Sequence, residues 1–144
     1  QVTSAEYAAA MTDKEIGDSL ISCAAVLVVR DIHQSVAFYR DRLGFGVAEI
    51  WGDPPSFAIA DIPRASIMLK QVNGGDGSQT PAPNKTRVGG LWDAYIWVRD
   101  LKPVTDHLAA TGTEHSVPEE MSYGCTEIVV TDPDGYLICF GYCP

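Results

Sequence analysis

The sequence predicts an α+β fold made of two copies of one β-α-β-β-β unit, and three observations support this prediction. Val28 to Ile32 aligns with Trp97 to Leu101, and the aspartates of the two segments are 69 residues apart. Ile67-Met68-Leu69 aligns with Ile138-Cys139-Phe140 at a separation of 71 residues. A hairpin near the end supplies the last two strands of the second copy. Because two copies at so long a period do not make a solenoid, we expect them to close into one domain.

A weakly helical lead-in, residues 1–20, precedes a single domain at residues 21–144. Gln1 to Ala10 come before Met11, a candidate natural start, and are set aside as a candidate expression remnant. The domain divides into module one (residues 21–72), a linker (residues 73–90) and module two (residues 91–143). The linker is rich in Gly, Pro, Ser and Asn and has no apolar period, so we expect no regular element there.

The helix of module one has a clear start and stop. Asp31 is the expected N-cap, and Gln34, three residues on, completes a capping box. The apolar residues at i, i+3 and i+7 predict the buried face, at Val36, Tyr39 and Leu43. Gly44 then supplies a left-handed stop, so the helix is expected to end at about Leu43.

Four apolar runs are the expected strands of module one. The first is Ala24 to Val29, which is apolar throughout. Val47 to Trp51 and Phe57 to Ala60 flank a Gly-Asp-Pro-Pro turn, and Ser66 to Gln71 closes the module.

Module two repeats this order. Asp93 to Val98 is the expected first strand. Asp100 is the expected cap of a helix that carries Val104 and Leu108 on one face and ends at Gly112. The parallel with module one is the basis for the duplication.

The closing hairpin lies within Tyr123 to Phe140. Ile128 to Val130 is β-branched and Tyr136 to Phe140 is almost wholly apolar, as expected for two strands. Between them Pro133 favours a type I turn, the aspartates can accept nearby backbone N–H groups, and Gly135 can adopt positive φ. This stretch is the most specific local signal in the sequence.

Composition narrows the classes of function. The net charge of −9 disfavours nucleic acid as a partner and suits a cationic ligand, although acidity often serves solubility alone. No apolar run approaches the roughly 20 residues that span a bilayer, and no signal peptide is recognised, so we expect no membrane partner. The four cysteines have no Cys-x-x-Cys spacing. A reducing, cytoplasmic location is the default prediction, with a disulfide left open.

The arrangement resembles the vicinal oxygen chelate superfamily of glyoxalases, bleomycin-resistance proteins and ring-cleaving dioxygenases. The similarity lies in Val29-Arg30-Asp31 with the helix ending Leu43-Gly44-Phe45, in Ile67-Met68-Leu69, and in the Tyr123 to Ile138 hairpin. It implies two curled mixed sheets around a ligand cup, the glyoxalase/bleomycin resistance fold. It also implies pairing as a homodimer. A shared fold specifies function poorly.

The resemblance implies four metal-ligand positions, on the first and last strands of each module. They fall at Ala24, Met68, Asp93 and Cys139. Ala24 has no donor atom and Met68 offers a soft thioether, so we predict a degenerate site with no metal and no other cofactor. An unrelated metal site that uses His33, His107 and His115 is the alternative.

Strand alternation predicts what lines the cup instead. Tyr95, Trp97 and Met68 would form an aromatic, adaptable wall, although each could equally be ordinary core. Asp93 could bind a cationic group or pair with Lys70. The rim candidates are Phe57, Trp51, Trp92 and Tyr123. Glu127 occupies a position where metal-free relatives often carry Glu in a Trp-Gly-x-Arg-Glu-like run; a structural role is favoured because the chain reads Tyr-Gly-Cys-Thr-Glu.

These residues support two functions of different classes. The first is a metal-independent protein that sequesters an aromatic or cationic small molecule, such as an antibiotic, with no catalytic residues. The alternative is a metal-dependent lyase, isomerase or dioxygenase with an unconventional site. A third reading, a metal-free enzyme that uses Cys139 or Glu127, ranks below both because neither has a partnered histidine in sequence.

Overall fold

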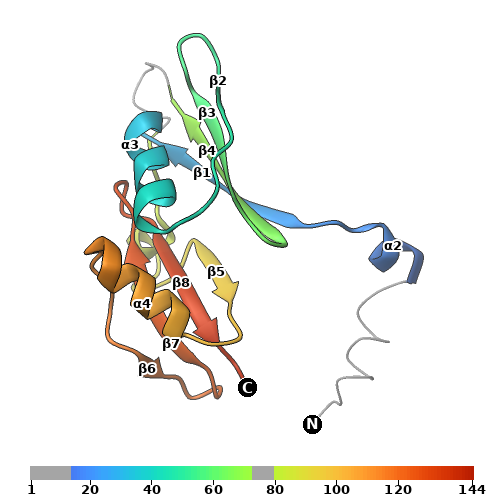
Figure 1. Cartoon of the computed structure of the whole chain (residues 1–144), viewed down its shortest axis with the longest axis vertical. Coiled ribbons are helices and arrows are strands. Elements are labelled where there is room, and N and C mark those ends of the chain that lie inside the picture. The colour runs from blue at the N-terminus through green and yellow to red at the C-terminus, as the bar shows by residue number, and fades with distance from the viewer. Residues whose placement is uncertain (1–13, 73–79) are drawn as a thin grey trace.

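The computed structural model describes residues 14–72 and 80–144, and its two modules each form a four-stranded mixed sheet (Figure 1). The strands are β1 (Cys23–Val29), β2 (Ile50–Trp51), β3 (Phe57–Ile62) and β4 (Ala65–Gln71), then β5 (Ala94–Trp97), β6 (Glu119–Glu120), β7 (Thr126–Thr131) and β8 (Leu137–Tyr142). The strand orders are β1-β4-β3-β2 and β5-β8-β7-β6. The same order appears twice, which confirms the predicted α+β fold and its duplication. The sheets stay open and do not close into a barrel.

Register also repeats between the modules. The first strand pairs with the last in parallel, β1 with β4 and β5 with β8, so that Val26 lies opposite Met68 and Tyr95 lies opposite Cys139. The remaining pairs in each sheet are antiparallel. The sequence alignment of Met68 with Cys139 therefore corresponds to equivalent places in the two sheets.

The helix of module one begins as predicted but changes its winding. In α3 (Ile32–Ala37) the Asp31 carboxylate accepts the backbone N–H groups of His33 and Gln34 at 2.9 and 3.1 Å. The next five residues, η1 (Phe38–Arg42), form a π-helical turn. The three residues of the predicted face are all buried: Val36, Tyr39 and Leu43. Gly44 has a φ of 77°, which confirms the left-handed stop.

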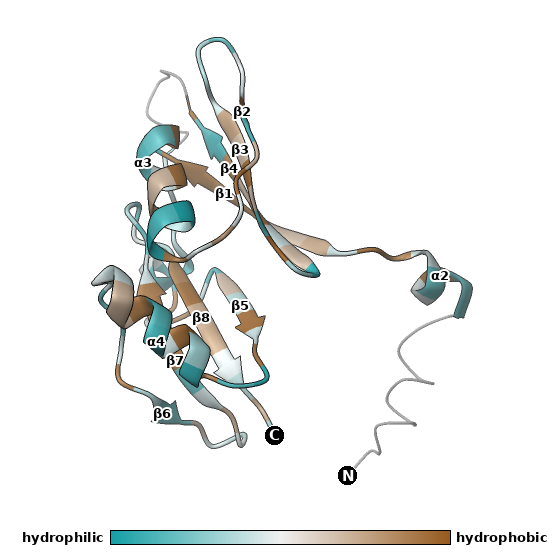
Figure 2. Ribbon diagram, viewed as in Figure 1, coloured by the Kyte–Doolittle hydropathy of each residue, from teal (hydrophilic) through white to brown (hydrophobic). Residues whose placement is uncertain are grey.

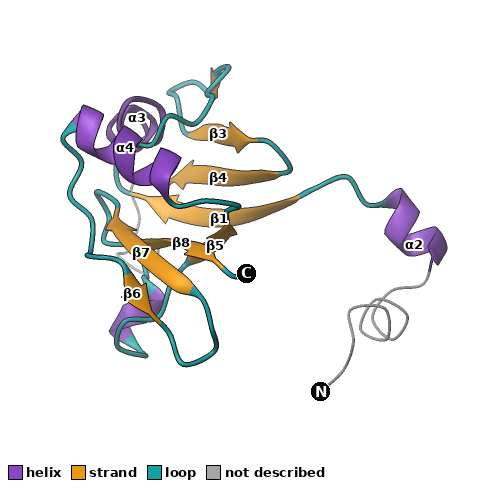
Figure 3. Cartoon of the chain, turned by 60° about the horizontal axis from the view of Figure 1, so that its bottom comes forward, coloured by secondary structure: helices purple, strands orange, loops and turns teal. Residues whose placement is uncertain are grey.

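Module two's helix, α4 (Lys102–Thr111), starts two residues after the predicted cap. Asp100 still serves the helix start, because its carboxylate accepts the backbone N–H of Lys102 at 2.9 Å. Gly112 ends the helix with a φ of 64°. Helices α3 and α4 lie together on the same side of the two sheets (Figure 3), and Arg42 donates to the carbonyl oxygen of Thr111 at 2.7 Å.

Alternation along the strands separates a core face from an open face. Four strands, β1, β4, β7 and β8, each contribute two side chains to the core: Leu27, Val29, Ile67, Leu69, Ile128, Val130, Ile138 and Phe140. Residues of the other parity, such as Val26 and Trp97, point away from this core and are 65% and 74% exposed. Figure 2 shows the hydrophobic strands of both sheets and the hydrophilic α2 and β6.

Some boundaries differ from prediction. The strand predicted at Val47 to Trp51 is only the two-residue β2, and Gly46 instead forms an isolated bridge with Asp61. Part of the predicted linker is a short 3-10 helix, η2 (Asn84–Thr86). The lead-in contains α2 (Lys14–Ser19), which stands away from the domain (Figure 1). Residues 1–10 and the linker segment 73–79 lie outside the described residues.

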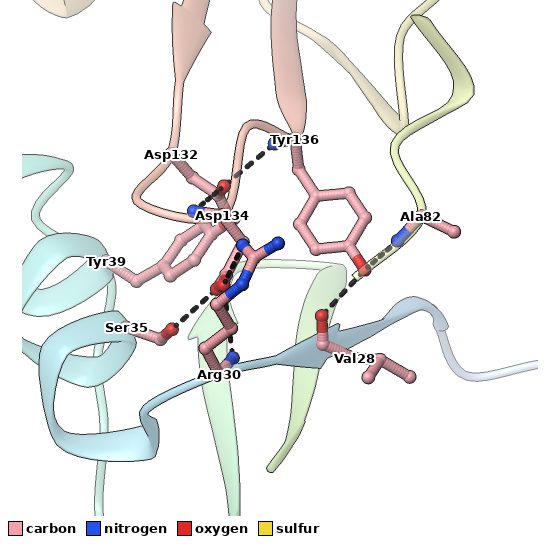
Figure 4. Close-up of polar contacts among 8 residues, drawn as sticks. All are labelled: Val28, Arg30, Ser35, Tyr39, Ala82, Asp132, Asp134 and Tyr136. Atoms are coloured by element: carbon pink, nitrogen blue, oxygen red, sulfur yellow. Dashed lines mark hydrogen bonds and ion pairs between the residues drawn. The ribbon is translucent and has the colours of Figure 1, made fainter. Parts of the chain in front are cut away.

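The Asp132-Pro133-Asp134-Gly135 turn fastens module two to module one (Figure 4). Asp134 accepts the backbone N–H and the guanidinium of Arg30 at 3.1 and 3.3 Å and the Ser35 hydroxyl at 3.4 Å. Asp132 accepts the hydroxyl of Tyr39 at 2.7 Å. Tyr136 donates from its hydroxyl to the carbonyl oxygen of Val28 at 2.6 Å. The turn therefore joins the two modules as well as connecting the two strands of the hairpin.

The cysteines do not all remain reduced. Cys125 and Cys143 form a disulfide, whereas Cys23 and Cys139 are free. In the described part of the chain, no helix is both long enough and apolar enough to cross a bilayer.

Candidate functional site

An aromatic hollow lies on the open face of the second sheet. It has a volume of about 400 Å³ and is lined by Trp92, Tyr95, Trp97, Tyr123 and Cys125. The Tyr95 ring centroid is 4.9 Å from that of Trp92 and 5.0 Å from that of Trp97, with planes inclined at 71° and 55°. Four residues predicted to bind ligand, from β5 and two flanking loops, thus line one surface. We call it the aromatic hollow.

A buried carboxylate holds two of these rings in place. Glu127, on β7, is 4% exposed and accepts the Tyr95 hydroxyl at 2.8 Å and the Tyr123 hydroxyl at 2.5 Å. Sequence reasoning favoured a structural role for Glu127, and these bonds give it one. They also place a negative charge directly behind the aromatic hollow.

Gly141 gives Tyr95 the room to reach this carboxylate. A Cβ at position 141 would lie 2.0 Å from the Tyr95 hydroxyl oxygen and 2.4 Å from its Cζ atom. The ring therefore lies across β8 where any other residue would block it. No motif in the sequence marks Gly141, although a glycine inside a strand does indicate close approach of another group.

The Cys125–Cys143 disulfide forms part of the same surface. Thr126 pairs with Tyr142 at the ends of β7 and β8, so Cys125 and Cys143 are the next facing positions in this ladder. The Cys143 Sγ atom is 3.7 Å from the Tyr95 hydroxyl. Sequence reasoning missed this pair because cysteine spacing alone cannot assign connectivity.

The two tyrosine hydroxyls of the site and the Cys139 thiol stay protonated at neutral pH. The hydrogen bond to Glu127 is the main cause that raises the pKa of Tyr123 to about 12. Burial, followed by the bond to Glu127, also raises the pKa of Tyr95. Burial raises the pKa of the Cys139 thiol to about 12. Because the thiolate is the reactive form, Cys139 is poorly suited to act as a nucleophile.

The first sheet carries the other predicted ligand-binding residues. Met68 is half-buried on β4 and Phe57 lies on β3, where its ring is 5.8 Å from that of Trp51. Lys70 is exposed and donates to the Ser56 hydroxyl at 3.1 Å. These residues do not line the aromatic hollow.

Asp93 has a backbone role. One of its carboxylate oxygens accepts the N–H of Asn84 and the other accepts the N–H of Leu137, both at 2.8 Å. Among the described residues Asp93 forms no ion pair with Lys70, whose ammonium donates to Ser56. Asp93 thus connects η2, within the linker, to the start of β8.

The four positions implied for a metal do not suit a hard divalent ion. Ala24 supplies no donor, Met68 supplies a thioether, both oxygens of Asp93 accept backbone N–H groups, and Cys139 holds its proton. Across residues 14–72 and 80–144, no three His, Cys, Asp or Glu side chains are grouped closely enough to hold a metal ion. The three histidines are on different elements and form no such group: His33 on α3, His107 on α4 and His115 in the following loop.

Comparison with known proteins gives the family. Residues 21–140 match the model of the Glyoxalase/Bleomycin resistance protein/Dioxygenase superfamily. The chain belongs to this superfamily. No curated protein matches the sequence significantly.

Solved structures share the fold at low sequence identity. A virulence protein from Salmonella typhimurium is 22% identical with a TM-score of 0.60, over 88% of this chain and 98% of the other. A glyoxalase/bleomycin resistance protein from Catenulispora acidiphila is 20% identical with a TM-score of 0.62, over 87% and 100%. TnmS3, an antibiotic binding protein from a Streptomyces species, is 19% identical with a TM-score of 0.61, over 86% and 98%. At such identities the likeness concerns the fold alone.

Proposed function

We propose that this chain is a metal-independent binding protein that sequesters an aromatic or cationic small molecule, such as an antibiotic. The observation that carries the proposal is the aromatic hollow with the buried Glu127 carboxylate behind it. Sequestration requires apolar faces and a few polar anchors, without a reacting group. The hollow meets that requirement.

Further observations support binding over catalysis. The side chains at the four implied metal positions do not suit a hard divalent ion, and the pKa of Cys139 is raised to about 12. One structural neighbour, TnmS3, is described as an antibiotic binding protein. The net charge of −9 also favours the approach of a cationic ligand.

Calorimetric titration with bleomycin-type and other cationic aromatic compounds tests the proposal. We expect saturable heat with the wild-type chain and at least a tenfold weaker Kd for Trp97→Ala, whose side chain is 74% exposed and so contributes little to folding. Tyr142→Ala is the matched control, since Tyr142 lies on β8 but points to the opposite face from Gly141. The absence of heat at any attainable concentration would remove the proposal.

The competing function is a metal-dependent lyase, isomerase or dioxygenase of the same superfamily. Membership in a superfamily whose name includes enzymes favours it. Elemental analysis of protein purified without chelators separates the two functions. We expect no stoichiometric metal, and about one tightly held ion per chain would favour the enzyme.

Homodimer formation belongs to the same proposal. Val26 leaves a large apolar side chain on the open face of the first sheet, at 65% exposure. A second copy that covers this face would bury it and leave the aromatic hollow open. Sedimentation equilibrium should give twice the mass of one chain, and a monomer at micromolar concentration would contradict this expectation.

Cytoplasmic location stays a prediction. The Cys125–Cys143 disulfide favours an oxidising compartment instead, because glutathione and thioredoxin keep most cytosolic thiols reduced. Alkylation of the protein in intact cells, followed by mass measurement, reports whether Cys125 and Cys143 are disulfide-bonded or reduced there.

A further inference from the structure

The rings that line the aromatic hollow meet at steep angles. The Trp92 plane is inclined at 71° to that of Tyr95, and the Trp97 plane at 55°. A flat ligand could lie against only one of these faces, because stacking requires near-parallel planes. A compact, rounded group could contact several faces at once.

Negative charge lies on the same face of the sheet. The Glu127 carboxylate sits beneath Tyr95 and Tyr123 and accepts both hydroxyls through one oxygen. Glu119 lies directly opposite Glu127 in the β6–β7 pair, so both side chains share a face. A rounded group in the hollow would therefore gain if it were positively charged.

Hydrogen-bonding capacity distinguishes one kind of cation from another. The Tyr95 and Tyr123 hydroxyls are directed at Glu127 behind the rings, and Glu127 is only 4% exposed, so this carboxylate is shielded from direct contact with a ligand in the hollow. The remaining lining is indole, phenol ring and Cys125 sulfur. A primary ammonium carries three N–H donors that would lose water partners here, whereas a quaternary ammonium carries none.

We propose that the aromatic hollow binds a methylated ammonium group through cation–π contacts with Trp92, Tyr95, Trp97 and Tyr123. Glu127 supplies the counter-charge from behind the rings. Attraction of a cation to several aromatic faces is the physical basis of such recognition. This inference rests on the proposed small-molecule binding function and names the chemical class of its ligand.

The test compares three small probes that share a hydroxyethyl group, by calorimetry or tryptophan fluorescence. Choline carries a trimethylammonium group, 3,3-dimethylbutan-1-ol is its uncharged carbon isostere, and ethanolamine carries a primary ammonium. We expect choline to bind at least tenfold more tightly than either of the others. Equal binding of choline and its uncharged isostere would overturn the inference, because it would reduce the hollow to an apolar surface.

Variants locate the probe. Trp97→Ala should weaken choline binding at least tenfold and Trp97→Phe should weaken it less, since a smaller aromatic face remains. Tyr142→Ala should bind choline as wild type does, and circular dichroism checks that each variant is folded. Unchanged choline affinity in Trp97→Ala would contradict the assigned site.

The outcome also separates this inference from the proposed function. If cationic aromatic compounds bind in a Trp97-dependent way and choline does not, the binding function stands and the ammonium assignment is wrong. If neither class of compound binds at any attainable concentration, both are wrong.

Discussion

At the scale of single residues, Gly141 decides where Tyr95 can lie. The Tyr95 ring occupies the space where a side chain at 141 would begin, and its hydroxyl reaches Glu127 at 2.8 Å. The arrangement of the aromatic hollow therefore depends on the absence of one methyl group.

Gly141→Ala should displace Tyr95 and weaken both folding and binding. A Cβ 2.0 Å from the hydroxyl oxygen forces the ring to move, and overpacking of this kind costs about 1–3 kcal/mol of unfolding free energy. Urea denaturation measures the loss. Gly89→Ala is the control, because a Cβ there meets nothing within 4 Å; an equal loss in both variants would contradict the assigned contact.

Tyr39→Phe should destabilise the chain in a pH-dependent way. The variant leaves the buried Asp132 carboxylate without its hydroxyl donor, which costs about 1–3 kcal/mol. Burial raises the pKa of Asp132, so the folded state binds this proton more tightly than the unfolded state. The favourable contribution of protonated Asp132 is complete below the unfolded value of about 3.9 and is lost as pH rises through the raised folded value.

The hydrogen bond from the Tyr39 hydroxyl lowers the pKa of Asp132, so the loss of this bond should raise that pKa further. Tyr39→Phe should therefore lose more unfolding free energy at pH 7 than near pH 4. Urea denaturation at the two pH values measures the difference, with the exposed Tyr142→Phe as control. A deficit that does not change with pH would show that the hydroxyl does not act on the carboxylate.

At the scale of elements, the closing turn links the modules. Its backbone was predictable, since Asp-Pro-Asp-Gly specifies a turn by itself: Gly135 has a φ of 88° and donates its N–H to the Asp132 carbonyl at 3.0 Å. The contacts of Asp134 with Arg30 and Ser35 were not predictable, because they join residues about a hundred positions apart. Local signals fix a turn and leave its partners undefined.

Asp134→Ala should weaken the contact between the two modules. The Ser35 hydroxyl and the Arg30 backbone N–H would lose their acceptor, at a cost of about 1–3 kcal/mol. Asp106→Ala is the control, because it removes an exposed ion pair with Lys102 and should cost less than about 1 kcal/mol. Chemical denaturation of both variants checks the prediction, which is wrong if the two losses are equal.

Reduction of the Cys125–Cys143 disulfide should loosen the wall that carries Tyr123. The bridge closes a segment of 18 residues, for which chain entropy gives about 3 kcal/mol of stabilisation. Cys125→Ser with Cys143→Ser should lower stability and weaken ligand binding. Cys23→Ser, at an exposed free cysteine, should change neither; ligand affinity that survives removal of the bridge would show that it serves folding alone.

The elements most poorly predicted are short or locally unusual. The α3 cap and its buried face followed from residue spacing, as did Gly44 and Gly112. The π turn η1 and the two-residue strands β2 and β6 have no periodic signal, since two residues cannot establish an alternation. Their formation depends on tertiary contacts instead.

At the scale of the whole molecule, the duplication was readable because both copies keep the same strand–Arg-Asp–helix junction. That repeat predicted two equivalent sheets, and strand parity predicted that Tyr95 and Trp97 share a face. Parity could not show that Met68, Lys70 and Phe57 lie outside the hollow, because it fixes a face within a sheet and leaves the placement of one sheet against the other undefined. The role of Gly141 could not be predicted either, because it depends on how closely the Tyr95 ring packs over β8.

The most direct test of the account uses the three tryptophans as position markers. Trp92 and Trp97 line the aromatic hollow, whereas Trp51 lies on the first sheet. A ¹H–¹⁵N spectrum of the indole groups is recorded during titration with a cationic aromatic compound that binds by calorimetry. If the compound occupies the aromatic hollow, the Trp92 and Trp97 signals should shift saturably, whereas saturation that leaves both signals unmoved would contradict the assigned site.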